Sequence, residues 1–356
     1  MTDSSSKTII STDGRILFYD LNHFIKDVVN GKCCFICGAI PGSKEFNDEH
    51  IIPDWILRRY NLHDKRIVLP NSTSIKYSQY TVPCCKECNS NLGKHFEEPM
   101  SELFSKTYEE ISKELFESEE KRDLVFRWLC LIYFKTHLKD KSLRGNQDRR
   151  EKETTIGDVH WWEDFHHVHC VVRSHHTHAH LESEVYGSFY FNKVLKEVND
   201  KEDKFDYIDN PITKGVLLRL GDFCITSILD DSFAAVSIYS NQLSSIDVGI
   251  TIFQFYEIFA HLNYIRVHLK NRPIFKSSIN SRTGYNILGI RPEKLELVEE
   301  ENRIGTHGDF LRVYVERIFG TIPDRERILK EIEEGKRSFL WDEQGDFYNM
   351  KEHVKL

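Results

Sequence analysis

The sequence has no long hydrophobic run. A membrane-spanning helix needs roughly 18 consecutive apolar residues, and polar or charged side chains interrupt every apolar stretch before that length is reached. The first twelve residues are rich in serine and threonine and lack the apolar core of a signal peptide. We therefore expect a cytoplasmic protein that has no membrane partner.

The sequence has fewer basic than acidic side chains. The chain of 356 residues carries a net charge of -8, whereas proteins that bind nucleic acid rely on lysine and arginine to displace counterions from phosphates. The acidic excess lies after residue 100, because the residues before it contain as many basic as acidic side chains. One later segment is basic and is interpreted either as a solvated loop or as a loop that contacts phosphate. Its members are Lys135, Lys139, Lys141, Arg144, Arg149, Arg150 and Lys152.

The nine cysteines are better explained by metal than by disulfides, since a reducing cytosol keeps thiols free. Six of them form two clusters, Cys33, Cys34 and Cys37, then Cys84, Cys85 and Cys88. Only Cys34 with Cys37 and Cys85 with Cys88 have the two-residue gap of a zinc knuckle. We predict that these four thiolates hold one structural Zn²⁺, with no position left open for water. The isolated Cys130, Cys170 and Cys224 are expected to be small buried side chains.

A carboxylate and a histidine stand between the two knuckles, in the segment Asn47-Asp48-Glu49-His50-Ile51-Ile52-Pro53-Asp54-Trp55. With a CxxC before it and Cys85-Lys86-Glu87-Cys88-Asn89 after it, this segment resembles the HNH endonuclease family. The likeness is to the branch whose first motif reads Glu-His-x-x-Pro-x-Trp. It covers about residues 30–98.

The resemblance implies a ββα-metal fold in which His50 is the general base and Glu49 and Asn89 bind a catalytic Mg²⁺ or Mn²⁺. The chemistry agrees, because phosphodiester hydrolysis needs a base for the attacking water and positive charge at the leaving oxygen. Further metal ligands left open are Asp48, His95 and Glu97, and Asp48 is an alternative to Glu49. The middle asparagine that usually orients the base has no clear counterpart, and Asn71 is a distant substitute.

The pattern along the chain predicts an α+β protein with four parts. These are an N-terminal leader (1–27), a zinc-stapled HNH module (28–98), a helical segment with a basic connection (99–152) and a β-rich domain with terminal helices (153–356). Apolar residues spaced by three or four predict helices over 97–139. Runs of β-branched and aromatic residues favour strands over 159–272, and Pro323 and Gly335 mark the ends of a later helix over 322–334.

A histidine-rich tract lies in the part expected to form strands. A second metal site there is conceivable, but no carboxylate or cysteine spacing defines one, and a strand and loop surface is the preferred interpretation. Trp161 and Trp162 are expected in the core rather than as a platform for bases. The tract contains His160, His166, His167, His169, His175, His176, His178 and His180.

The function expected from these features is a metal-dependent endonuclease that acts on DNA, in the setting of bacterial defence or restriction where HNH proteins of this build commonly occur. The alternative is a non-catalytic zinc module that binds nucleic acid or protein. From residue 159 onward there is no phosphate-binding glycine loop and no Ser/His/Asp signature. We expect that region to set substrate choice, oligomerisation or control through a regulatory ligand or protein.

Overall fold

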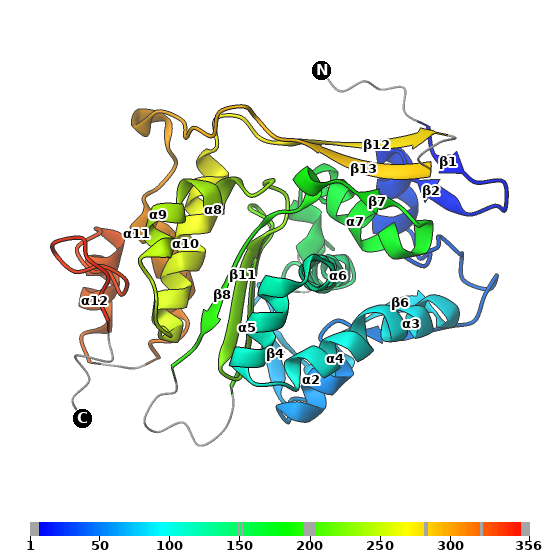
Figure 1. Ribbon diagram of the computed structural model, residues 1–356. Coiled ribbons are helices and arrows are strands. Elements are labelled where there is room, and N and C mark those ends of the chain that lie inside the picture. The colour runs from blue at the N-terminus through cyan, green and yellow to red at the C-terminus, as the bar shows by residue number, and fades with distance from the viewer. Residues whose placement is uncertain are drawn as a thin grey trace. The chain divides into compact units, whose positions relative to one another are not determined.

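The computed structural model describes residues 7–148, 150, 152–195, 204–280, 284–320 and 323–349 of a mixed α and β protein (Figure 1). The chain divides into two compact units. Unit 1 is Met1–Val185 with Phe275–Gly289, and unit 2 is Tyr186–Ile274 with Ile290–Leu356. The expected division at residue 153 is not where the units separate, because the helix that follows it packs within unit 1 and a later hairpin returns to that unit. Within the described ranges no helix is long and apolar enough to cross a membrane.

Unit 1 begins with a hairpin and continues into the segment that holds the cysteines. Strands β3 and β6 pair antiparallel, with Phe46 opposite Cys85 and His50 opposite Thr81, and α3 follows β6 directly. The bounds are β1 (Ile9–Ile10), β2 (Ile16–Phe18), α1 (Leu21–His23), a π-helical turn η1 (Phe24–Val29), β3 (Phe46–His50), α2 (Asp54–Arg59), β4 (Arg66–Val68), β5 (Ser74–Lys76), β6 (Thr81–Cys85), α3 (Lys86–Leu92), η3 (Gly93–Glu97) and α4 (Glu98–Phe104).

The helices expected over 97–139 are confirmed as α4, α5 (Tyr108–Glu117) and α6 (Glu119–Asp140). Thr107 and Glu110 form a capping box at the start of α5, and the Ser118 side chain caps α6. Helix α6 is buried along most of its length, so it serves as the centre of unit 1 rather than as a surface helix. Cys130 on α6, Cys170 later in unit 1 and Cys224 in unit 2 are buried, as predicted.

The strand prediction over 159–272 was wrong for a large part of the region. The histidine tract forms α7 (His166–Thr177), and the apolar run after residue 233 forms α8 (Ala234–Ile238) and not a strand. Helix α10 (Ile252–His268) is buried on nearly all sides, so its sequence shows no amphipathic period that would separate it from a buried strand. The capping box of Thr251 and Gln254 was the local signal for its start.

Unit 2 is an antiparallel sheet of order β8-β11-β10-β9, and α10 lies along it (Figure 1). The strands are β8 (Ser188–Lys193), β9 (Phe205–Asn210), β10 (Gly215–Leu220) and β11 (Phe223–Ile228). Helices α9 (Ser240–Ser244), α11 (His307–Glu316) and α12 (Arg325–Glu333) complete the unit. The predicted strands around 188–191 and 216–218 and the helix within 322–334 are confirmed, and Ile322 lies outside the described residues.

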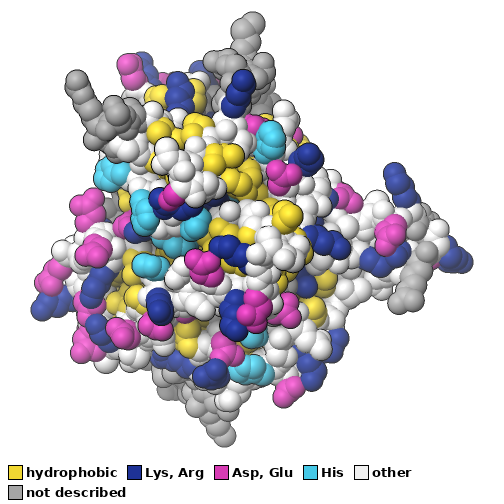
Figure 2. Space-filling view, turned by 90° about the vertical axis from the view of Figure 1, so that its right-hand side faces the viewer, with side chains coloured by type: hydrophobic (Ala, Val, Ile, Leu, Met, Phe, Trp, Pro, Cys, Tyr) yellow, Lys and Arg dark blue, Asp and Glu magenta, His cyan; other side chains and the backbone are white. Residues whose placement is uncertain are grey.

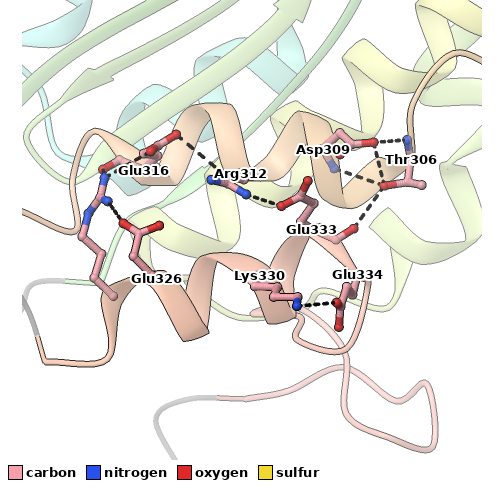
Figure 3. A network of polar contacts seen from close by, with 9 residues as sticks. Thr306, Asp309, Arg312, Glu316, Glu326, Lys330, Glu333 and Glu334 are labelled. Atoms are coloured by element: carbon pink, nitrogen blue, oxygen red, sulfur yellow. Dashed lines mark hydrogen bonds and ion pairs between the residues drawn. The ribbon is translucent and has the colours of Figure 1, made fainter.

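Helices α11 and α12 are joined by a surface network of ion pairs (Figure 3). Arg312 contacts both Glu316 and Glu333, and the Thr306 hydroxyl donates to the Glu333 carbonyl at 3.3 Å. Solvent screens exposed ion pairs of this kind, so each contributes little to stability. The fully buried Leu329 and Ile332 therefore contribute more to the docking of α12 than the charges do.

A second small sheet, of order β12-β13-β7, joins distant parts of the sequence. Strand β13 (Gly284–Ile290) runs parallel to β7 (His180–Leu181), with Ile287 opposite Leu181. Its other neighbour is β12 (Ile274–Asn280). This pairing explains why the hairpin 275–289 belongs to unit 1, about 90 residues after the rest of that unit ends.

Candidate metal centre and histidine site

Four cysteine sulfurs converge in unit 1, and they are the four that the sequence singles out. The Sγ atoms of Cys34, Cys37, Cys85 and Cys88 all lie within 4.8 Å of one another. The Cys37 and Cys85 sulfurs are 3.6 Å apart, close to the roughly 3.8 Å that a tetrahedral ion with metal–sulfur bonds of about 2.3 Å requires. The cluster can therefore hold a metal ion.

The two neighbouring cysteines have other positions. The Cys33 thiol donates to the Asp27 carbonyl at 2.8 Å. Cys84 approaches Cys34 to 3.7 Å between sulfurs, but it is not one of the four that converge. The two-residue gap between paired cysteines therefore identified the four converging cysteines correctly.

Local backbone geometry builds both knuckles. Gly38 has φ +79° and its N–H donates to the Cys34 carbonyl at 2.8 Å, which closes the first turn. In the second knuckle Cys85 ends β6 and is the N-cap residue of α3, so Cys88 comes around on the first turn of that helix. A strand that leads directly into a helix is what brings the second pair of sulfurs together.

His50 is the last residue of β3 and is half-buried. Asp54, four residues later at the start of α2, interacts electrostatically with His50, and its carboxylate accepts a hydrogen bond from His63 Nε2 at 2.9 Å. Burial acts to raise the pKa of Asp54, but the His63 hydrogen bond and the charges of Arg58 and His50 outweigh it and lower that pKa. An ionised Asp54 thus lies within electrostatic range of His50. The sequence motif contains Asp54, yet its relation to His50 was missed.

Asn89 lies beside the strand that carries His50. Its Nδ2 donates to Asn47 Oδ1 at 3.1 Å and approaches the Asp48 carbonyl at 3.5 Å. Asp48 itself is exposed. The structure therefore groups Asn89 with Asn47 and Asp48 at the β3–α3 contact.

Glu49 points the other way, into the interior. It is 8% exposed, and its Oε1 accepts from the Lys135 ammonium at 2.6 Å. Lys135 is fully buried in α6 and also donates to the His50 carbonyl at 2.7 Å. The prediction that Lys135 belongs to a basic surface segment was wrong, because no local pattern reveals a partner 86 residues earlier in the chain. Of the remaining members of that segment, Arg149 lies outside the described residues.

Glu97 joins this interior group. Its Oε2 accepts from Trp55 Nε1 at 3.1 Å, and its Oε1 is buried. Burial raises the pKa of Glu97 to about 7, the Lys135 charge acts to lower it, and the Glu49 charge acts to raise it further. Glu49, Glu97 and Lys135 form one buried charge cluster behind β3, named here the Lys135 cluster.

The histidine tract supports the first knuckle. His169 contacts the Phe35 carbonyl through Nε2 at 2.8 Å, and His166 contacts the Tyr19 carbonyl at 2.8 Å. Arg173 donates to the Ile36 carbonyl at 2.6 Å. Helix α7 thus satisfies backbone carbonyls around the cysteine turn, so the expected strand and loop surface is corrected to a helix with a buried structural face.

Other members of the tract line a cavity of about 190 Å³ beside Cys88. Burial lowers the pKa of His175 to about 3 and of His176 to about 4, so both rings are neutral near pH 7. His95 is exposed and lines this same cavity. Figure 2 shows histidine side chains gathered on one face with a basic side chain among them. The lining residues are Arg15, Ile36, Cys88, Asn91, His95, His175, His176 and His178.

Two further predictions have mixed outcomes. Trp162 is buried and its Nε1 donates to the Gly157 carbonyl at 2.9 Å, whereas Trp161 is 70% exposed. Asn71 donates to the Arg144 carbonyl at 2.7 Å and accepts from Thr73, so its side chain is engaged in a loop contact. That engagement makes Asn71 a poor substitute for the missing middle asparagine.

Two more groups of potential ligands occur in the described part of the chain. In unit 2, Glu257, His261 and His307 come together, but the Glu257 carboxylate already accepts from Ser338 and from the Phe339 and Leu340 amides. The two rings stack face to face with centroids 3.4 Å apart, an arrangement in which one ion cannot lie in both ring planes. The second group, His137, Asp140 and His160, is in unit 1 and has a different geometry.

No family model matches this chain, and no curated protein or solved structure is significantly similar to it. The residues and their geometry carry the functional inference.

Proposed function

We propose that residues 28–98 form an HNH-type nuclease module that hydrolyses phosphodiester bonds in DNA. The observation that supports it best is the contact of Asn89 with the strand that ends at His50, 3.1 Å from Asn89 Nδ2 to Asn47 Oδ1. Together with β3, β6 and α3 in order, this contact matches the strand–strand–helix layout that the family resemblance implies.

Zinc is the ion proposed for the four cysteines. Four soft thiolates with no vacant position suit Zn²⁺ in a structural role. Its binding would connect the turn before β3 with the β6–α3 junction, and so hold His50 and Asn89 in register.

A separate Mg²⁺ or Mn²⁺ is proposed at the exposed end of β3. The proposed ligands are the Asp48 carboxylate and the Asn89 amide oxygen, because the Glu49 carboxylate faces the Lys135 ammonium. Such an ion, when bound, supplies positive charge to the leaving oxygen. His50 takes the proton of the attacking water, and the ionised Asp54 favours the imidazolium that results.

The test is cleavage of supercoiled plasmid by the full chain with Mg²⁺ or Mn²⁺. His50→Ala is expected to abolish cleavage, while His180→Ala, which removes an exposed histidine of β7, leaves it unchanged. Asp48→Asn should lower cleavage by roughly 10²-fold or more by loss of a metal ligand. Cleavage that survives His50→Ala would refute the mechanism.

A non-catalytic zinc module remains the second candidate, because the Glu49 carboxylate is already neutralised by Lys135. It predicts that zinc-loaded protein takes up no Mg²⁺ or Mn²⁺. Titration calorimetry with Mn²⁺ on wild type and Asp48→Asn separates the two candidates. A heat of Mn²⁺ binding that is present in wild type and absent in Asp48→Asn supports the nuclease. Under either candidate we propose that unit 2 supplies control by a ligand or protein.

A further inference from the structure

Three potential metal ligands that the proposed function does not use meet at the C-terminal end of α6. His137 and Asp140 are three positions apart and so share one face of the helix, and His160 comes from the segment after a short 3-10 turn (Ile156–Val159). His137 is 2% exposed and Asp140 is 4% exposed. The His160 side chain is 6% exposed. These three residues are named here the His-Asp-His cluster.

One potential ligand atom from each of the three residues lies within 4.8 Å of the other two, close enough for a single ion to contact all three. A single oxygen, Asp140 Oδ2, lies 3.2 Å from His137 Nδ1 and 2.9 Å from His160 Nε2. Ligands about 2.0–2.1 Å from a tetrahedral ion are separated by roughly 3.3 Å. The two rings are nearly perpendicular, at 88°, so an ion can lie in both ring planes. The stacked rings of His261 and His307 lack this property.

Charge at this position also calls for a cation. Asp140 is the last residue of a 22-residue helix, where the helix dipole disfavours an anion. In the described part of the chain its ion-pair partners are these two imidazoles, with no lysine or arginine among them. The nearby Lys141 pairs with Asp158 at 2.5 Å instead. A divalent ion bound by these three residues would place positive charge directly beside the buried carboxylate.

Aromatic side chains surround the cluster. The ring of Tyr133 is 4.4 Å from that of His137, and the ring of Phe165 is 5.3 Å from it. Trp162 packs at 5.7 Å from His160. An apolar shell around a polar ligand set excludes competing water and holds the rings in place.

From these observations we propose that His137, Asp140 and His160 form a second metal site that binds a divalent transition ion of the zinc class. Two nitrogens and one carboxylate oxygen suit such an ion and leave its fourth position for water or another small ligand. The ion joins the C-terminal end of α6 to the segment 156–160, and so closes the connection between them.

The experiment is metal analysis of the full chain after equilibration with excess Zn²⁺ and removal of unbound ion. Wild type is expected to retain two ions per chain. His160→Gln keeps a side-chain N–H for Asp140 but is a poor ligand for zinc, so it should retain one. The matched control is His23→Ala, which breaks a histidine–aspartate pair of 2.6 Å with Asp20 and should retain two.

Cobalt substitution tells the two sites apart. Co²⁺ bound by thiolates gives intense sulfur-to-metal charge-transfer bands, whereas the His-Asp-His cluster gives only weak d–d bands. His160→Gln and Asp140→Asn should each remove the weak bands and leave the charge-transfer bands unchanged. One ion per chain in folded wild type, or two retained by folded His160→Gln, would overturn the proposal. If both variants misfold, the wild-type count and the second set of cobalt bands decide it.

Discussion

Replacing Lys135 by methionine tests the buried Lys135 cluster directly. Lys135 is fully enclosed, and its ammonium donates to Glu49 Oε1 and to the His50 carbonyl. Methionine fills a similar volume but carries no charge. The substitution therefore leaves the 8% exposed Glu49 carboxylate in the interior without its cation.

The expected cost follows from this loss. Removing one partner of a buried ion pair costs about 3–5 kcal/mol, and the lost bond to the His50 carbonyl adds about 1 kcal/mol. Glu49→Gln should cost less, about 1–2 kcal/mol, because Glu97 is a second carboxylate close to Lys135 and its pKa falls once the Glu49 charge is gone. The double variant should be more stable than Lys135→Met alone, since it leaves no unpaired charge.

Urea unfolding of the metal-loaded chain near pH 7.5, followed by tryptophan fluorescence, measures these differences. Four of the five tryptophans lie in unit 1, so the signal reports mainly on the unit that contains the cluster. They are Trp55, Trp128, Trp161 and Trp162.

The matched control is Lys139→Met on the same helix, at a half-buried position with no ion pair in the described chain. It should change the stability by less than about 1 kcal/mol. A Lys135→Met variant as stable as this control would refute the buried pair. A double variant whose cost equals the sum of the single costs would refute the coupling between Glu49 and Lys135.

Two further predictions concern unit 1. Because the folded-state pKa of Glu97 is raised from 4.5 to about 7, unfolding releases a proton between these pH values, so stability should fall by up to about 3 kcal/mol as the pH rises through them. Glu97→Gln should flatten this slope in urea midpoints measured from pH 5 to 8, and an unchanged slope would contradict the assignment. Gly38→Ala should destabilise unit 1 by about 1–3 kcal/mol and weaken zinc retention, since its φ is +79° and a Cβ would lie 2.1 Å from the Tyr19 hydroxyl. Gly42→Ala, with φ +89° and nothing within 4 Å, is the control for the backbone conformation alone, and equal losses of Tm in the two variants would argue against the clash.

Features encoded in short stretches of sequence were predictable. The two-residue gap selects Cys34 and Cys37 over Cys33, because a tight turn is all that is needed to bring two sulfurs to one side. The helices over 97–139 also follow from local spacing. Both features depend on neighbours no more than a few residues away.

Features that depend on distant partners were not predictable. Lys135 resembles its solvated neighbours in sequence, and only the packing of α6 behind β3 makes it an internal counter-ion. Helix α7 was mistaken for strand because histidine occupies both fully buried and half-buried positions of the helix, which hides the helical period. The His-Asp-His cluster requires His160 to fold back on α6, and no spacing rule contains that contact.

The choice between Asp48 and Glu49 as a metal ligand now has a physical basis. Adjacent residues on a strand point to opposite faces, and β3 turns Glu49 inward while Asp48 is exposed. The inward face is neutralised by Lys135, so a second cation there would meet a positive charge at close range. This arrangement requires two results. Asp48→Asn should lower nuclease activity, and Glu49→Gln should still bind Mn²⁺. The reverse pattern would mean that Glu49 leaves Lys135 when the ion binds, and would make the buried pair a resting state of the site.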